Sequence, residues 1–269
     1  MRLLLGATAL AVALVSAAQA QAPTAAQVHE AERMRFGFGA LRPGATSDPG
    51  KPNSSNADET KVARLALPPL FASSAPPTPE GWDRRRAELA RLVEDNWVGR
   101  IPEAVAGFRV AWRKEAVPAP RGAAAEHWIG QVVTPDGRSG PMVDATITFP
   151  AAAAGAPALI DYSYIWPGGR TPDFGGPPAP DSVALALSHG FAHVAYRPQL
   201  LQGDSAVTMQ VGIIGLARWP RERTDWGALR AWAWGASQLR EELARDPRIN
   251  GARISLAGHS RFGKGVLVA

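Results

Sequence analysis

The sequence contains no cysteine among its 269 residues. This absence excludes a disulfide framework, a thiolate nucleophile and the lipid attachment that needs an N-terminal cysteine. Hydrophobic residues make up 46% of the chain, which is enough for a substantial core without covalent cross-links. Cysteine chemistry therefore supports neither the structure nor the catalysis of this protein.

Blocks of basic residues are also missing, although the formal net charge is +5. The lysines and arginines are scattered along the chain. A nucleic-acid-binding face would need them clustered on one surface. We therefore expect a solvated basic surface and no nucleic-acid partner.

Long apolar runs are confined to the N-terminus. Met1-Arg2 precedes an apolar run to about Val15, and Ala18-Gln19-Ala20 supplies the small residues of a cleavage site. The run is short for a membrane span, which takes about 20 residues. The sequence predicts a signal peptide over residues 1–20, with an uncleaved anchor as the alternative. The mature chain would begin at Gln21, would be periplasmic or secreted, and would not associate with a membrane.

Composition divides the remainder of the chain. Residues 21–56 contain a weak helical pattern and then many glycine, proline, serine and asparagine residues, which indicates a flexible arm or linker. Residues 57–269 carry regular hydrophobic periodicity. We expect them to form a partial catalytic domain.

Periodicity predicts the order of elements in that domain. Helices are expected at 80–96, 182–189 and 225–245, and strands at 108–114, 126–133, 142–149, 158–165, 191–197 and 254–257. Strands and helices alternate from about residue 158, which predicts a mostly parallel sheet with helices on both faces. The fold class is therefore α/β, a three-layer sandwich of the α/β-hydrolase type whose first strands form an antiparallel edge.

The most informative stretch is 254–265, a short apolar strand, a turn with Ser260 at its tip and the start of a helix. An α/β-hydrolase presents its nucleophile on such a turn, the nucleophile elbow. Phe262 departs from the usual Gly-x-Ser-x-Gly, because the second glycine comes one residue later, at Gly263. The alternative is a plain turn in which Ser260 caps the helix.

The partners of a catalytic serine are not found after it. In an α/β-hydrolase an acid and a histidine follow the serine, but only nine residues follow Ser260 and none is His, Asp or Glu. The five histidines, at 29, 127, 189, 193 and 259, all precede it, and we expect none of them to be the base. We therefore expect an N-terminal fragment that ends just after the elbow, with a C-terminally incomplete sheet and no activity alone. A natural short protein is the alternative.

Residues 258–264, Gly-His-Ser-Arg-Phe-Gly-Lys, resemble the nucleophile motif of the glucuronoyl esterases, carbohydrate esterase family 15. The segments 225–235 and 246–249 are similar to the helix and turn that precede the elbow in that family. Looser similarity covers 56–62, 67–70 and 97–102.

The resemblance implies a secreted serine esterase that cleaves esters between the (4-O-methyl)glucuronic acid of xylan and lignin alcohols. It implies Ser260 as the nucleophile, Arg261 as a stabiliser of the oxyanion and Lys264 as a ligand of the sugar hydroxyls. It implies no metal or organic cofactor, and we expect a monomer. The Gly-rich loop Trp166–Gly169 could add an oxyanion donor, but a plain turn is favoured.

Two other classes of function stay open at this point. One is a different α/β-hydrolase, such as an acetyl-xylan esterase or a peptidase. The other is a non-catalytic carbohydrate-binding or scaffold protein, since the base is missing. The Arg261 and Lys264 cations beside the serine favour a uronate over an acetyl group.

Overall fold

The computed structural model describes residues 25–39, 43–46, 48, 50–55, 58–63, 66, 68–71, 77–119, 123–151, 154–164 and 181–269. The predicted signal peptide, the loop Trp166–Gly169 and the segment 56–57 lie outside the described residues. The chain divides into two units, residues 1–68 and 69–269.

The first unit contains little regular structure among its described residues. Helix α1 (Ala25–Arg35) is followed by an isolated bridge between Thr46 and Ser54 and by the 3₁₀ turn η1 (Glu59–Lys61). Arg33 closes the end of α1 by donating to Glu30 and to the Phe38 carbonyl, at 2.8 and 2.6 Å. In the part of the predicted arm 21–56 that the structure describes, there is thus one helix.

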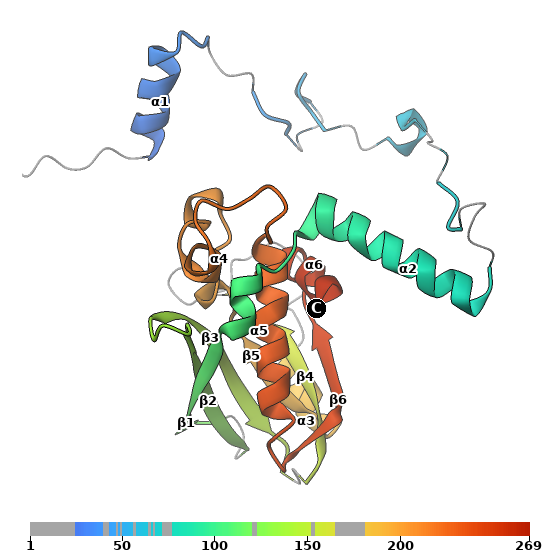
Figure 1. Ribbon diagram of the computed structural model, residues 1–269, viewed down its shortest axis with the longest axis vertical. Helices are drawn as coiled ribbons and strands as arrows, with labels where there is room; N and C mark the ends of the chain where they lie inside the picture. The colour runs from blue at the N-terminus through green and yellow to red at the C-terminus, as the bar shows by residue number, and fades with distance from the viewer. Residues whose placement is uncertain are drawn as a thin grey trace, which may run out of the picture. The chain divides into compact units, whose positions relative to one another are not determined.

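The second unit is built on a six-stranded sheet with the order β1-β2-β3-β5-β4-β6 (Figure 1). The strands are β1 (Arg109–Val117), β2 (Ala124–Val133), β3 (Ser139–Phe149), β4 (Ala156–Tyr162), β5 (Ala192–Tyr196) and β6 (Ile249–Ala257). The predicted face of β3, from Val143 to Phe149 at every second residue, is buried.

The described sheet is mixed rather than mostly parallel, which corrects the prediction. The pairings β1–β2, β2–β3 and β3–β5 are antiparallel, and only β5–β4 and β4–β6 are parallel. Short connections between β1, β2 and β3 can join only antiparallel neighbours. Parallel neighbours need crossovers, which here run through helices α3 and α5.

Helices cover both faces of the sheet, as predicted for a three-layer α/β fold. The helices of this unit are α2 (Pro79–Val93), extended by a π-helical turn (Glu94–Val98), α3 (Ser182–Ser188), α4 (Gly212–Ala217), α5 (Ala228–Leu243) and α6 (Arg261–Val268). Short 3₁₀ turns lie at Glu103–Gly107, Pro198–Leu200 and Ala206–Thr208. Helix α5 lies in front of the sheet and α3 behind it (Figure 1).

Helix α5 begins three residues later than the sequence predicts. The Asp225 carboxylate does not cap it, because it accepts from the Arg218 side chain at 2.9 Å and from the Glu222 N–H at 2.7 Å. Gly227 is the N-cap instead.

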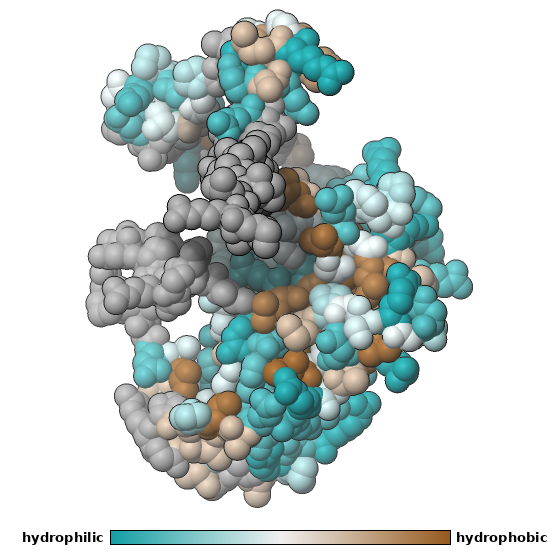
Figure 2. Space-filling view, turned by 90° about the vertical axis from the view of Figure 1, so that its left-hand side faces the viewer, coloured by the Kyte–Doolittle hydropathy of each residue, from teal (hydrophilic) through white to brown (hydrophobic). Residues whose placement is uncertain are grey.

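On the face that carries β1 and α4, hydrophobic residues lie in small groups between hydrophilic ones (Figure 2). Of the helices described, none is both long and apolar enough to cross a membrane.

Candidate active site

Ser260 lies on a sharp turn between the end of β6 and the start of α6. Its φ of 55° and ψ of −120° are in the left-handed half of backbone space, which non-glycine residues rarely adopt. Its side chain makes no capping hydrogen bond to α6, so the helix-cap alternative is not what the structure shows. Such strain is typical of functional positions, and the geometry is that of a nucleophile elbow.

The turn depends on a glycine two residues before the serine. A Cβ at Gly258 would lie 2.8 Å from the backbone carbon and oxygen of Phe262, closer than side chains approach. The Phe262 N–H donates to the His259 carbonyl at 3.0 Å, and the Lys264 N–H donates to the Ser260 carbonyl at 3.2 Å. These bonds join the turn directly to the first turn of α6.

Phe262, which stands where the usual motif has glycine, anchors the elbow to the hydrophobic core. Its ring is fully buried, stacks on Tyr164 at a centroid distance of 4.0 Å and meets the edge of Trp232 at 5.0 Å. A Cβ at Gly265 would lie 3.2 Å from the Tyr162 ring and 3.4 Å from the Trp232 ring, so glycine lets α6 lie close to both. No sequence motif indicated this role, although Phe262, Gly265 and Val266 have the spacing of a buried helix face.

Arg261 and Lys264 line one open hollow beside the elbow, of about 290 Å³. The Arg261 Nη1 donates to the Asp204 carboxylate at 2.6 Å. Trp97 and the start of α5 complete the lining. The structure therefore places Arg261 and Lys264 in one hollow, which Ser260 adjoins in the chain but does not line. It adds Trp97, from the segment 97–102, and Asp204, which no sequence motif indicated.

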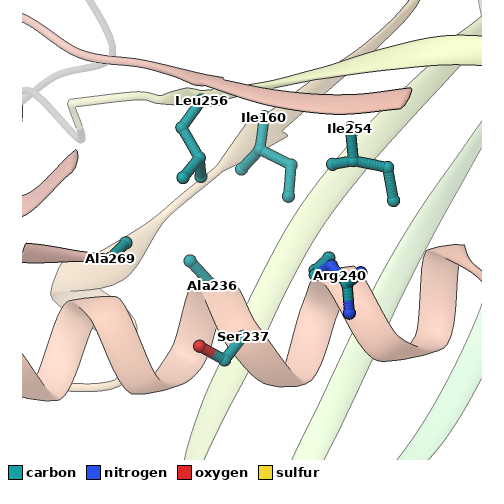
Figure 3. A pocket seen from close by; sticks show the side chains of 7 residues that line it. All are labelled: Ile160, Ala236, Ser237, Arg240, Ile254, Leu256 and Ala269. Atoms are coloured by element: carbon teal, nitrogen blue, oxygen red, sulfur yellow. The ribbon is translucent and has the colours of Figure 1, made fainter. Parts of the chain in front are cut away.

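A second hollow, between α5 and strands β4 and β6, has no comparable chemistry (Figure 3). Ile160, Ile254 and Leu256 point from the strands toward Ala236 on α5. The Ser237 hydroxyl donates to the Ala233 carbonyl at 3.1 Å, so it is already engaged within the helix. The hollow beside Ser260 is the better candidate for a site.

All five histidines fall within the described residues, and none hydrogen-bonds the Ser260 hydroxyl. The His127 Nε2 lies 2.7 Å from the Asp144 carboxylate. The His193 Nε2, which is buried, lies 3.3 Å from both Asp161 and Ser182. Among the described residues, no group of three His, Cys, Asp or Glu side chains could hold a metal ion.

A strained serine between a strand and a helix, on a mixed sheet covered on both faces, is typical of the α/β-hydrolase class. Comparison with known proteins narrows this class. The sequence profile described as "Glucuronyl esterase, fungi" matches residues 132–269. The chain therefore belongs to the glucuronoyl esterase family, carbohydrate esterase family 15.

Individual relatives agree with this assignment. The chain is 26% identical over 216 residues to 4-O-methyl-glucuronoyl methylesterase 1 of Wolfiporia cocos. This alignment covers 77% of this chain and 45% of the relative. It is 27% identical over 206 residues to the 4-O-methyl-glucuronoyl methylesterase of Hypocrea jecorina, in an alignment that covers 74% of this chain and 37% of the relative. The chain thus spans less than half the length of these two relatives.

Solved structures give the same result. A glucuronoyl esterase from Teredinibacter turnerae superposes with a TM-score of 0.70 at 30% identity, over 91% of this chain and 63% of that one. A glucuronoyl esterase from Solibacter usitatus superposes with a TM-score of 0.61 at 27% identity, over 78% of this chain and 61% of that one.

Proposed function

We propose that the protein hydrolyses esters of glucuronic acid, with Ser260 as the nucleophile. The observation that carries the proposal is the strained Ser260 turn, beside which Arg261 and Lys264 line the same hollow. The similarity to proteins named glucuronoyl esterases supports this substrate class. By the same similarity, the ester joins xylan-borne (4-O-methyl)glucuronic acid to a lignin alcohol.

The reaction proceeds through an acyl-enzyme. The Ser260 Oγ attacks the ester carbonyl, its proton passes to a general base, and the alcohol leaves with a proton. Water then attacks the acyl-serine, which frees glucuronic acid and restores the hydroxyl. We assign the base to none of the five histidines of this chain, because none of them hydrogen-bonds the Ser260 hydroxyl.

Arg261 stabilises the negative charge that develops on the ester oxygen. As the residue after the nucleophile, it can present its backbone N–H to that oxygen, and its guanidinium adds a positive charge. Lys264 lies one helical turn beyond the serine and binds the hydroxyls of the sugar. A lysine at this place favours a polar uronate over an acetyl group.

The test is hydrolysis of benzyl glucuronate by the native protein, meaning the enzyme with its general base present, and by its Ser260→Ala variant. We expect turnover by the native protein and a loss of about 10⁶-fold in the variant, as for other serine hydrolases that lose the nucleophile. Circular dichroism would show that the variant is folded. Turnover by the variant at the native rate would refute the assignment.

We also propose that the protein is exported and acts in the periplasm or outside the cell. The apolar run and the small residues before Gln21 support this. N-terminal sequencing of the exported protein should read from Gln21, and an intact Met1-Arg2 terminus would contradict the proposal.

A further inference from the structure

The Arg261 guanidinium is held by one carboxylate from a distant part of the chain. Its Nη1 donates to the Asp204 Oδ2 at 2.6 Å, across 57 residues of sequence. The Asp204 side chain is 21% exposed, whereas the Arg261 side chain is 58% exposed. Among the described residues Asp204 is the only hydrogen-bond partner of this guanidinium, so Nε–H and Nη2–H make no second bond there.

The loop that carries Asp204 is anchored on both sides. Before it, the buried Gln202 accepts from the Ile214 N–H at 3.1 Å and from the Trp232 indole N–H, through its carbonyl, at 2.8 Å. After it, the Gln202 side-chain amide donates to the Thr208 carbonyl at 2.9 Å, and the Thr208 hydroxyl donates to the Ser205 carbonyl at 2.8 Å. The carboxylate is therefore presented from a fixed position, close to α5 and to the elbow.

A fixed carboxylate matters because an exposed arginine is flexible. Ordering its side chain costs conformational entropy, and a charge contributes most to catalysis when it is already in place before the transition state forms. An arginine bound through one end of its planar fork keeps its other donors in a defined plane. Exposed ion pairs add little to stability, so orientation is the larger effect of this contact.

We propose that Asp204 is a positioning residue that orients the Arg261 guanidinium toward the oxyanion formed at Ser260. Asp204 acts through Arg261 and does not touch the reacting atoms. This inference rests on the proposed function, since it assumes that Arg261 stabilises the oxyanion.

The experiment is a double-mutant cycle in the native protein, with benzyl glucuronate as substrate. Arg261→Ala should lower kcat by about 10²–10³-fold, as loss of an oxyanion donor does in comparable enzymes. Asp204→Ala should lower kcat by about 10-fold, because the guanidinium remains but is no longer oriented. The KM should change little in both variants, and Asp204→Glu should recover part of kcat. In the Arg261→Ala background, Asp204→Ala should have no further effect.

A control variant tests the loss of an ion pair away from the site. Arg113 and Glu115 on β1 form an exposed pair at the same distance, 2.6 Å. Glu115→Gln should leave kcat and KM unchanged. Asp204→Asn, which keeps the size of the side chain and one acceptor oxygen, guards against a folding defect in Asp204→Ala.

Each other outcome decides against the inference. If the kcat of Asp204→Ala equals or exceeds that of the native protein, the ion pair does not orient Arg261 for catalysis. An equal loss in the Arg261→Ala background, or a change confined to KM, would show that Asp204 acts on the fold or on the substrate directly. Absence of Ser260-dependent turnover in the native protein would instead overturn the proposed function, and the inference with it.

Discussion

At the scale of single residues, we propose that Lys264 decides which acyl group the site prefers. It follows Ser260 by one helical turn, is exposed, and lines the hollow that also holds Trp97 and Asp204. A lysine has three donors on a flexible stem, which suits the hydroxyls of a sugar ring. An acetyl group offers it no such acceptor.

Lys264→Ala should therefore reduce kcat/KM for a glucuronate ester far more than for an acetyl ester. A hydrogen bond from a charged donor contributes about 1.5–3 kcal/mol, which corresponds to a loss of about 10- to 150-fold. Parallel assays on benzyl glucuronate and 4-nitrophenyl acetate measure the difference. Lys61→Ala, which changes an exposed lysine in the N-terminal unit, serves as the control. Equal losses on both esters would contradict a role in sugar binding.

At the scale of elements, α6 contributes to the site only as long as it is anchored to α5 and β4. Phe262 makes that anchor, because its ring packs against Trp232 and two tyrosines. Leu267 lies on the same helix but points outward and is 82% exposed. The two residues form a matched pair for testing how much the anchor stabilises the fold.

Phe262→Ala should lower the free energy of unfolding by about 3–5 kcal/mol, as the loss of a buried aromatic ring does. Leu267→Ala should change it by less than about 0.5 kcal/mol. Urea denaturation of the native protein and both variants measures the difference. Similar values for the two variants would show that the ring is not part of the core in solution.

The sequence predicted those elements whose local pattern is strong. The alternation from Val143 to Phe149 gave β3, and its buried face is confirmed. The Gly-His-Ser run predicted the strand, turn and helix around Ser260, which the structure contains. Local periodicity reports which face of an element is buried, so these predictions needed no knowledge of partners.

What the sequence missed depends on contacts between distant residues. Asp204 meets Arg261 across 57 positions, and no pattern marks the pair. The start of α5 was placed too early because Asp225, an ordinary helix cap, is already bound to Arg218. Strand direction likewise follows from how the chain crosses over, which hydrophobic spacing does not record.

At the scale of the whole molecule, Arg248 links the antiparallel and parallel halves of the sheet. It immediately precedes β6 and donates to Glu126 on β2 at 2.7 Å, 122 residues away. It also donates to Asp246 at 2.7 Å, and its guanidinium lies 3.7 Å from the centroid of the Phe149 ring. These hydrogen bonds hold the pKa of Glu126 and of Asp246 below their ordinary values.

Arg248→Met should lower the free energy of unfolding at pH 7, by about 1–2 kcal/mol for a partly exposed charged network. A lowered folded-state pKa stabilises the fold above the unfolded pKa, and this stabilisation is lost as the pH falls through the folded pKa. The difference between the native protein and the variant should therefore shrink below about pH 4, near the unfolded values.

Urea denaturation at pH 7 and pH 3 measures this change. Arg138→Met removes the exposed pair with Asp136 and should matter little at either pH. A gap between the native protein and Arg248→Met that is equal at both pH values would show that the carboxylates are not involved.

The positive φ of Ser260 also decides which inactive variant is worth making. Alanine has a Cβ and bears nearly the same conformational penalty as serine, so Ser260→Ala differs from the native protein mainly in one oxygen atom. Glycine adopts a positive φ without this penalty, which is about 1–3 kcal/mol for other residues. Ser260→Gly would therefore be both inactive and more stable, and a substrate bound to it would meet a relaxed loop. For trapping a bound ester, Ser260→Ala is the better variant because it keeps the backbone strain of the native elbow, whereas Ser260→Gly relieves it.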